Sequence, residues 1–271
     1  MDNRPVGIFD SGLGGLTSLR ELRKILPNES IIYFGDTGRN PYGTRPVEQL
    51  RRMAQEDMEL LERLGAKAII AACGTVSSTA PDVLAAFRLS TFNVIDESVR
   101  VMAEIPGNAP FGVIATDASI RSGAYKRRLN EICPGREVID IACQDFVRLV
   151  EEGHTADDDP LLDEAVERYL APMREKHVCA LLLGCTHFDF AAGAISRYLG
   201  ADVVLVSAGG SAAHSMKRYL EENDMLGSDG SELFYSSGSG TDFAVHARNL
   251  LGRDIGIVEK AYAGREEPTK T

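Results

Sequence analysis

Two of the five cysteines, Cys73 and Cys185, stand at matching places: each ends an apolar run and precedes a turn that contains threonine. A cysteine at the end of a strand is often a small buried residue, and for an arbitrary pair that structural interpretation is the natural one. The shared context of these two favours a chemical role. Because a thiol that faces the N-terminus of a helix has a lowered pKa, we expect both thiols to titrate below about 8.5 and nearer neutrality.

Two thiols that face each other across a cleft can invert a stereocentre without a cofactor. One, as the thiolate, removes a proton from a carbon atom, and the other, as the thiol, returns a proton to the opposite face. Such acid/base groups work best when their pKa lies near the working pH. Cys133, Cys143 and Cys179 have no comparable context, and we interpret them as structural. The sequence contains no C-x-x-C pair or Cys/His cluster, so neither a disulfide framework nor a metal site is indicated.

The elements that must position these thiols follow an α/β pattern. Short apolar runs alternate with longer amphipathic segments along the chain. Such apolar strands are typical of a parallel sheet that helices cover on both faces, so we predict an α/β fold. The expected strands are 6–9, 31–35, 67–72, 92–95, 111–115, 137–141, 178–183, 202–206, 232–235 and 256–258. The expected helices are 16–26, 47–64, 119–132, 161–176, 191–199, 212–223 and 242–250.

A weak internal repeat divides the chain into two related α/β units. The strand and turn at 6–12 resemble those at 111–117, and the run that ends in Cys73 resembles the one that ends in Cys185. We therefore predict two pseudo-symmetric α/β domains with parallel-sheet cores. Open α/β sheets bind ligands beyond the carboxyl ends of their strands, so the active site should lie in the cleft between the domains. The predicted domains are residues 1–97 plus 208–271 and residues 98–207.

Four segments, in this order, resemble signatures of the glutamate racemase family. They are GIFDSGLGGL at 7–16, YFGDT at 33–37, PYG at 41–43 and LGCTH at 183–187. The likeness extends from about residue 5 to residue 210 and is vaguer beyond. No single segment is specific, but the ordered set is.

The resemblance implies two α/β domains with the active site between them, and a reaction that requires neither pyridoxal phosphate nor a metal. Cys73 and Cys185 would be the two catalytic acid/base groups. Asp10 would support the cysteine on its side of the substrate, and Glu151 and His187 would be the polar partners of the other. Family members often dimerise, so we expect a homodimer. The positions that contact substrate in the family are Asp10, Ser11, Tyr42, Gly43, Gly74, Thr75, Thr186 and His187.

The chemistry of these residues agrees with the implied roles. Backbone N–H groups and hydroxyls at strand-to-helix turns suit the carboxylates of an amino acid. The glycine run 12–15 lets the backbone approach a ligand, and alone it could equally bind phosphate. It lacks the full G-x-G-x-x-G spacing and the lysine of a P-loop, which argues against nucleotide binding. Asp10 alone could equally cap a helix.

The net charge and the hydropathy of the chain limit the classes of molecule that the protein is expected to bind. Lysine and arginine number 29 against 40 aspartates and glutamates, a net charge of −11, so nucleic acid and anionic membranes are poor partners. No apolar stretch approaches the roughly 20 residues that span a bilayer. The first residues do not resemble a signal peptide, so we expect a cytoplasmic protein acting on a small molecule.

Three positions depart from the family pattern. Gly74 replaces the usual asparagine after the first cysteine, and losing a side-chain partner for the ligand typically costs about 1–3 kcal/mol. Phe188 and Asp189 replace Tyr-Pro, and Gln144 replaces the proline after Cys143; these changes should alter packing more than chemistry.

The first hypothesis is a glutamate racemase that supplies D-glutamate for peptidoglycan. The nearest alternative is aspartate racemase, which shares the two-cysteine plan. A decarboxylase of related sequence would keep one of the two cysteines, so the presence of both argues against it. An amino-acid-binding protein of the same fold without catalysis is the alternative from another functional class, with Gly74 as a lost substrate contact.

Overall fold

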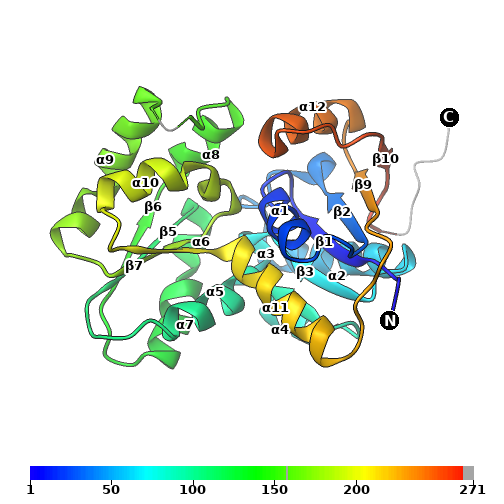
Figure 1. The fold of residues 1–271 in the computed structure, drawn as a ribbon, viewed down its shortest axis with the longest axis horizontal. Coiled ribbons are helices and arrows are strands. Elements are labelled where there is room, and N and C mark those ends of the chain that lie inside the picture. The colour runs from blue at the N-terminus through cyan, green and yellow to red at the C-terminus, as the bar shows by residue number, and fades with distance from the viewer. Residues whose placement is uncertain (157, 265–271) are drawn as a thin grey trace.

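The computed structural model describes residues 1–156 and 158–264, and of Glu151 it describes the backbone alone. The strands in this part of the chain pair in parallel and form two sheets, in separate lobes in Figure 1. The six-stranded sheet has the order β10-β9-β2-β1-β3-β4, and the four-stranded sheet has the order β6-β5-β7-β8. The first sheet consists of β1 (Val6–Asp10), β2 (Ile31–Gly35), β3 (Ala68–Ala71), β4 (Thr91–Asn93), β9 (Glu232–Ser236) and β10 (Val258–Lys260). The second consists of β5 (Phe111–Ala115), β6 (Val138–Ala142), β7 (Ala180–Leu183) and β8 (Val204–Ser207).

Helices cover both faces of each sheet, which explains why the central strands β1, β3, β5 and β7 are buried along their whole length. The predicted α/β fold with two parallel sheets is therefore confirmed. In the first half of the chain the helices are α1 (Leu16–Ile25), α2 (Val47–Arg63), α3 (Gly74–Thr79), α4 (Pro81–Ala85), α5 (Val94–Ala103), α6 (Asp117–Ser122) and α7 (Ala124–Ile132). In the second half they are α8 (Gln144–Glu151), α9 (Pro160–Glu175), α10 (Ala192–Leu199), α11 (Ala208–Glu222) and α12 (Gly240–Leu251). The 3-10 turns are η1 (Thr37–Arg39) and η2 (Thr186–Ala191).

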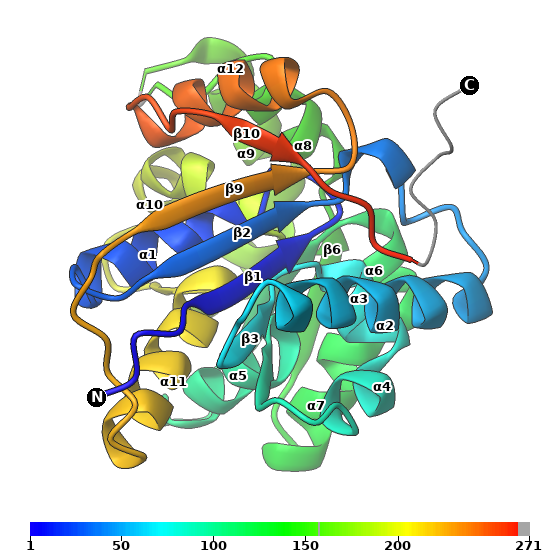
Figure 2. The same ribbon diagram turned by 90° about the vertical axis from the view of Figure 1, so that its right-hand side faces the viewer.

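The internal repeat corresponds to a repeat of strand order. The order β2-β1-β3-β4 in the first sheet matches β6-β5-β7-β8 in the second. The register repeats as well, because Val6 pairs with Ala68 in one sheet and Phe111 pairs with Ala180 in the other. These are the segments that resemble each other in the sequence, so the pseudo-symmetry has a structural basis. Strands β9 and β10 extend the first sheet alone, as Figure 2 shows.

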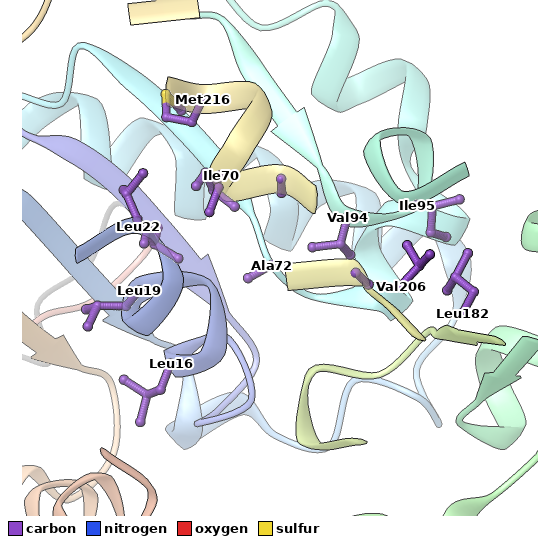
Figure 3. Close-up of a cluster of buried hydrophobic side chains, with 14 of the residues drawn as sticks. Leu16, Leu19, Leu22, Ile70, Ala72, Val94, Ile95, Leu182, Val206 and Met216 are labelled. Atoms are coloured by element: carbon purple, nitrogen blue, oxygen red, sulfur yellow. The ribbon is translucent and has the colours of Figure 1, made fainter. Parts of the chain in front are cut away.

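One hydrophobic cluster joins the two halves. Leu16, Leu19 and Leu22 of α1 and Met216 of α11 belong to the same buried cluster as Leu182 of the second sheet (Figure 3). Helix α11 follows β8 directly and packs against both α1 and α5. The relative position of the two sheets is therefore fixed by a continuous apolar core.

The predicted domain boundaries stay a prediction. The first sheet draws its strands from residues 6–93 and 232–260, and the second from residues 111–207. The boundary placed after residue 97 falls inside α5, which packs against α11 on one side and α7 on the other.

Two predicted elements are wrong in detail. The strand expected at 92–95 ends at Asn93, whose side chain accepts a hydrogen bond from the amide of Asp96 and so begins α5. The single helix expected at 119–132 is two helices, because Gly123 adopts a left-handed conformation (φ 64°) that ends α6. Across the residues that the structure describes, no helix has the length and apolarity needed to cross a membrane.

Candidate active site

A cavity of about 390 Å³ lies at the carboxyl ends of β1, β3, β5 and β7. Residues from both halves of the chain line it, as expected for a site at the edge of two parallel sheets. Of the predicted site residues, those that line this cavity are Asp10, Ser11, Tyr42, Gly43, Cys73, Gly74, Thr75, Cys185, Thr186 and His187. Glu151 ends α8, and its side chain lies outside the described part of the structure.

The two cysteines occupy equivalent turns that face each other. Cys73 follows β3 and caps the N-terminus of α3, whereas Cys185 follows β7 and caps η2. A Cβ atom placed on Gly74 would lie 3.4 Å from the carbonyl oxygen of Gly184. The residue after one cysteine is thus in near contact with the residue before the other, and both thiols border one cavity.

Asp10 and Cys73 form a buried pair on the side of the first sheet. Asp10 ends β1 and accepts a hydrogen bond of 2.7 Å from the amide of Gly12. Burial raises the pKa of Asp10, and the Gly12 amide and the nearby His187 counteract that rise.

The Cys73 thiol does not have the lowered pKa expected from the sequence. Burial, followed by the negative charge of Asp10, raises the pKa of Cys73 to about 12. The amide of Val76 at the start of α3 and the hydrogen bonds from Ser11 act in the opposite direction but are weaker. At neutral pH Cys73 therefore carries its proton.

The glycine turn after β1 packs directly against the LGCTH segment at 183–187. A Cβ atom on Gly14 would lie 2.2 Å from Oγ1 of Thr186 and 2.9 Å from Nδ1 of His187. The same His187 nitrogen lies 3.7 Å from Sγ of Cys185. The glycine turn therefore contacts His187, which lies beside the thiol of Cys185, and only glycine leaves room for that contact.

The side chain of Tyr42 points away from the substrate space. It is 1% exposed, and its hydroxyl contacts the carboxyl groups of Asp36 and Asp57 beneath the loop. Tyr42 thus lines the cavity as part of a loop, residues 40–44, that the buried hydroxyl anchors.

Several lining residues were not predicted from the sequence. They include Asn40, Thr116, Ser119, Arg121 and Gln144. The internal repeat carried a signal for one of them, because Thr116 takes the place of Ser11 in the second unit. Thr116 caps α6 through the amide of Ser119, so both hydroxyls lie at the start of that helix. No cluster of His, Cys, Asp and Glu suited to a metal ion occurs among the described residues.

The comparisons with known proteins agree with this geometry. Residues 19–214 match the family model of Asp/Glu/hydantoin racemases. A glutamate racemase of Corynebacterium diphtheriae is 40% identical over 268 residues, which covers 97% of this chain and 100% of that protein. Among solved structures, a glutamate racemase isoform from Bacillus anthracis has a TM-score of 0.88 at 30% identity, covering 97% of this chain and 98% of that one. The Francisella tularensis glutamate racemase in complex with D-glutamate has a TM-score of 0.86 at 34% identity, covering 97% and 99%.

A cleft enzyme built from two parallel α/β units with a thiol on each side is the class that fold and site define. The chain belongs to the aspartate/glutamate racemase family. It is accordingly an amino-acid racemase, an enzyme of the isomerase class.

The Gly14 contact gives the first prediction. Gly14→Ala should lower kcat/KM at least about 100-fold, because the added methyl group must displace Thr186 or His187 from the cavity wall. Gly12→Ala is the matched control: its Cβ would meet nothing closer than 3.8 Å, so its effect should be at least about tenfold smaller. Steady-state kinetics on both variants decides, and equal losses would refute the steric argument.

The carboxyl group of Asp189 lies just after the LGCTH segment, in η2. Asp189 accepts a hydrogen bond of 2.7 Å from Ser207, the residue that caps α11. Burial raises the pKa of Asp189 to about 6, against the opposing effects of Ser207 and of Arg20 on α1, while Glu21 adds to the rise. At neutral pH the ionised form of Asp189 therefore lowers the free energy of unfolding.

The raised pKa of Asp189 predicts how the stability of the protein depends on pH. Since the folded pKa lies above the ordinary value of 3.8, stability attributable to Asp189 is lost as the pH rises from about 4 through 6. Asp189→Asn keeps an acceptor for Ser207 and should stabilise the protein by up to about 3 kcal/mol at pH 7.5, and by little near pH 4. Urea unfolding at both pH values measures this, and a gain that does not depend on pH would contradict it.

Proposed function

We propose that the protein is a cofactor-independent glutamate racemase that interconverts L- and D-glutamate. The observation that carries this proposal is that Cys73 and Cys185, at equivalent turns, open onto one cavity from the two halves of the chain. Cys73 and Cys185 would be the acid/base pair, with Asp10 supporting the first and His187 and Glu151 the second. This arrangement suits proton removal on one face of a carbon atom and proton return on the other.

The raised pKa of Cys73 suggests the order of events. A bound amino acid brings an ammonium group, and beside Asp10 its positive charge offsets the charge that helps to keep Cys73 protonated. In one direction the Cys185 thiolate takes the Cα proton, so the Cα–H bond breaks and an S–H bond forms. Cys73 then gives its proton to the opposite face of the carbon and becomes the thiolate. The roles exchange in the reverse direction.

The negative charge that develops on the substrate carboxylate needs hydrogen-bond donors. Backbone amides at the start of α3, at Gly74 and Thr75, and at Thr186 in η2 border the cavity. Donors at such turns are held in place before the reaction and stabilise the charge without reorganisation. Ser11 and the loop of Tyr42 and Gly43 border the rest of the substrate space.

Glutamate is the substrate that the relatives' names support, since the similar proteins are named glutamate racemases. The cavity also fits an anionic side chain, because Arg121 of α6 brings a positive charge to its lining. We propose that the product supplies peptidoglycan synthesis in the cytoplasm, and that the chain forms a homodimer.

Isotope exchange tests the mechanism. In D2O, purified protein incubated with L-glutamate should incorporate deuterium at Cα while D-glutamate accumulates toward a 1:1 mixture, as NMR at the α position would show. Cys73→Ser and Cys185→Ser should each lower the racemisation rate at least about 100-fold, because a hydroxyl is a far weaker acid/base group. Cys133→Ser, which changes a thiol outside the cavity lining, is the control and should keep the wild-type rate. Full activity in both active-site variants would overturn the catalytic assignment.

Substrate choice is tested in the same assay. We expect L-aspartate to turn over at least about tenfold more slowly than L-glutamate in kcat/KM, since a shorter side chain leaves polar groups of the cavity unpaired. Faster turnover of aspartate would make the protein an aspartate racemase. Binding of glutamate without deuterium exchange would make it a binding protein of the same fold.

A further inference from the structure

One wall of the cavity is a loop with no regular structure of its own. Residues 40–44 all line the cavity and lie between η1 and α2. Figure 2 shows this connection crossing the carboxyl edge of the sheet between the end of β2 and α2. A binding wall made of loop needs support from packed side chains to hold its shape.

That support is a cluster of charged residues beneath the loop, which we call the Arg39 cluster: Asp36, Arg39, Tyr42, Glu56 and Asp57. Arg39 donates hydrogen bonds to Asp36 (2.5 Å) and Asp57 (2.6 Å) and a third to Glu56. Tyr42 bonds to Asp36 and lies 3.0 Å from Asp57. Asp36 and Asp57 are fully buried, and neither belongs to the cavity lining.

The cluster also closes the loop at its base. The guanidinium of Arg45 donates two hydrogen bonds, of 2.9 Å and 2.5 Å, to the carbonyl oxygen of Arg39. The amide of Arg45 bonds to the carbonyl oxygen of Tyr42 at 3.0 Å. The two ends of the loop are therefore joined, and its centre is anchored to α2 through Asp57.

The hydrogen-bond inventory requires a proton within the cluster. The Tyr42 hydroxyl has one hydrogen, yet it lies within hydrogen-bond distance of two carboxyl groups. Asp36 accepts from Arg39, Tyr42 and Ser237, as a carboxylate does. Every atom is satisfied if Asp57 is neutral and donates to the Tyr42 oxygen while Tyr42 donates to Asp36. Burial and the charge of Asp36 raise the pKa of Asp57 well above its usual value, and they outweigh the lowering effects of Arg39 and of the Tyr42 hydroxyl.

We propose that the Arg39 cluster, with one proton held between Asp57 and Tyr42, is a positioning device that sets loop 40–44 for substrate binding. Arg39 and Asp57 act through the loop and do not touch the reacting atoms. The proposal rests on the proposed racemase function, since it concerns the binding wall of that site. The other charged groups at the cluster are Arg45 and Arg52, the latter 3.8 Å from Glu56.

Neutral substitutions at the two carboxyl groups test the position of the proton. Asp57→Asn replaces a neutral donor with a neutral donor, so its KM for L-glutamate should stay within about threefold of wild type at pH 7. Asp36→Asn puts a neutral amide where a carboxylate accepts from Arg39, and its KM should rise at least about tenfold. In wild-type protein KM should rise as the pH is raised and Asp57 ionises, and in Asp57→Asn this rise should be absent. A larger KM effect in Asp57→Asn than in Asp36→Asn would overturn the assignment.

Substitutions of Arg39 test the positioning role itself. Arg39→Gln should raise KM at least about tenfold with a smaller change in kcat, because the loop shifts while the cysteines keep their places. Arg39→Lys keeps the charge but cannot reach three carboxyl groups, so it should fall between wild type and Arg39→Gln. Arg63→Gln, which removes an equal charge from an exposed position at the end of α2, should leave kcat and KM unchanged.

The proposed racemase function and the proposed positioning role of the Arg39 cluster can be refuted separately. Circular dichroism on each variant shows whether it is folded, and calorimetric titration with L-glutamate measures affinity independently of turnover. A wild-type protein that binds glutamate without racemising it would contradict the proposed function. In that case the affinity of each variant for glutamate, relative to wild type, would still test the positioning role of the Arg39 cluster. Folded Arg39 variants with wild-type affinity and KM would refute the positioning role alone.

Discussion

The approach of two turns is the constraint on which the site depends. The turn after β3 carries Cys73 and the turn after β7 carries Cys185, and they come within contact distance at Gly74 and Gly184. Each turn is set by a parallel strand that is buried along its length, so neither can move without its sheet. The apolar cluster shared by α1, α11 and the second sheet fixes one sheet against the other. The proposed proton transfer between opposed faces of one carbon atom would demand such rigidity, because small misplacements of reacting groups cost large factors in rate.

The residues around this contact carry a cost in stability. Asp10 and Asp57 are buried and Asp189 is half-buried, and loss of contact with water raises the pKa of each. Perturbed groups of this kind are frequent at functional sites, and of these three only Asp10 lines the cavity. Burial and then the negative charge of Asp10 raise the pKa of Cys73, so these two cavity residues are linked electrostatically. In the proposed mechanism, the ammonium group of the substrate would lie beside Asp10 and ease ionisation of the thiol.

The sequence predicted the strands and the turns that follow them, because apolar strands and glycine-rich turns are local signals. It predicted ten of the cavity-lining residues: seven lie in the ordered motifs, and Cys73, Gly74 and Thr75 lie at the turn that the internal repeat relates to Cys185. It missed α3, α4, α5 and α8, and of these α3 and α4, of six and five residues, are too short for an apolar period to show. The pKa of Cys73 was wrong because the helix N-terminus is visible in the sequence, whereas burial and the nearness of Asp10 arise only in the fold. The sequence likewise could not predict that the side chain of Tyr42 points away from the cavity, since its partner Asp57 lies on the next helix.

The pseudo-symmetry of the two units explains the opposed thiols but not recognition of a substrate, because the two sides of an amino acid differ. Some element without a counterpart must therefore hold the side chain. The connection after β2 is such an element: residues 36–46 lie between β2 and α2, whereas the equivalent strand β6 reaches α8 through Cys143 alone. The long connection contains loop 40–44 and is anchored by Arg39 and its carboxyl partners. Symmetry in this protein thus places the two thiols at equivalent turns, and the break in symmetry at this loop gives the cavity a wall that has no counterpart in the other unit.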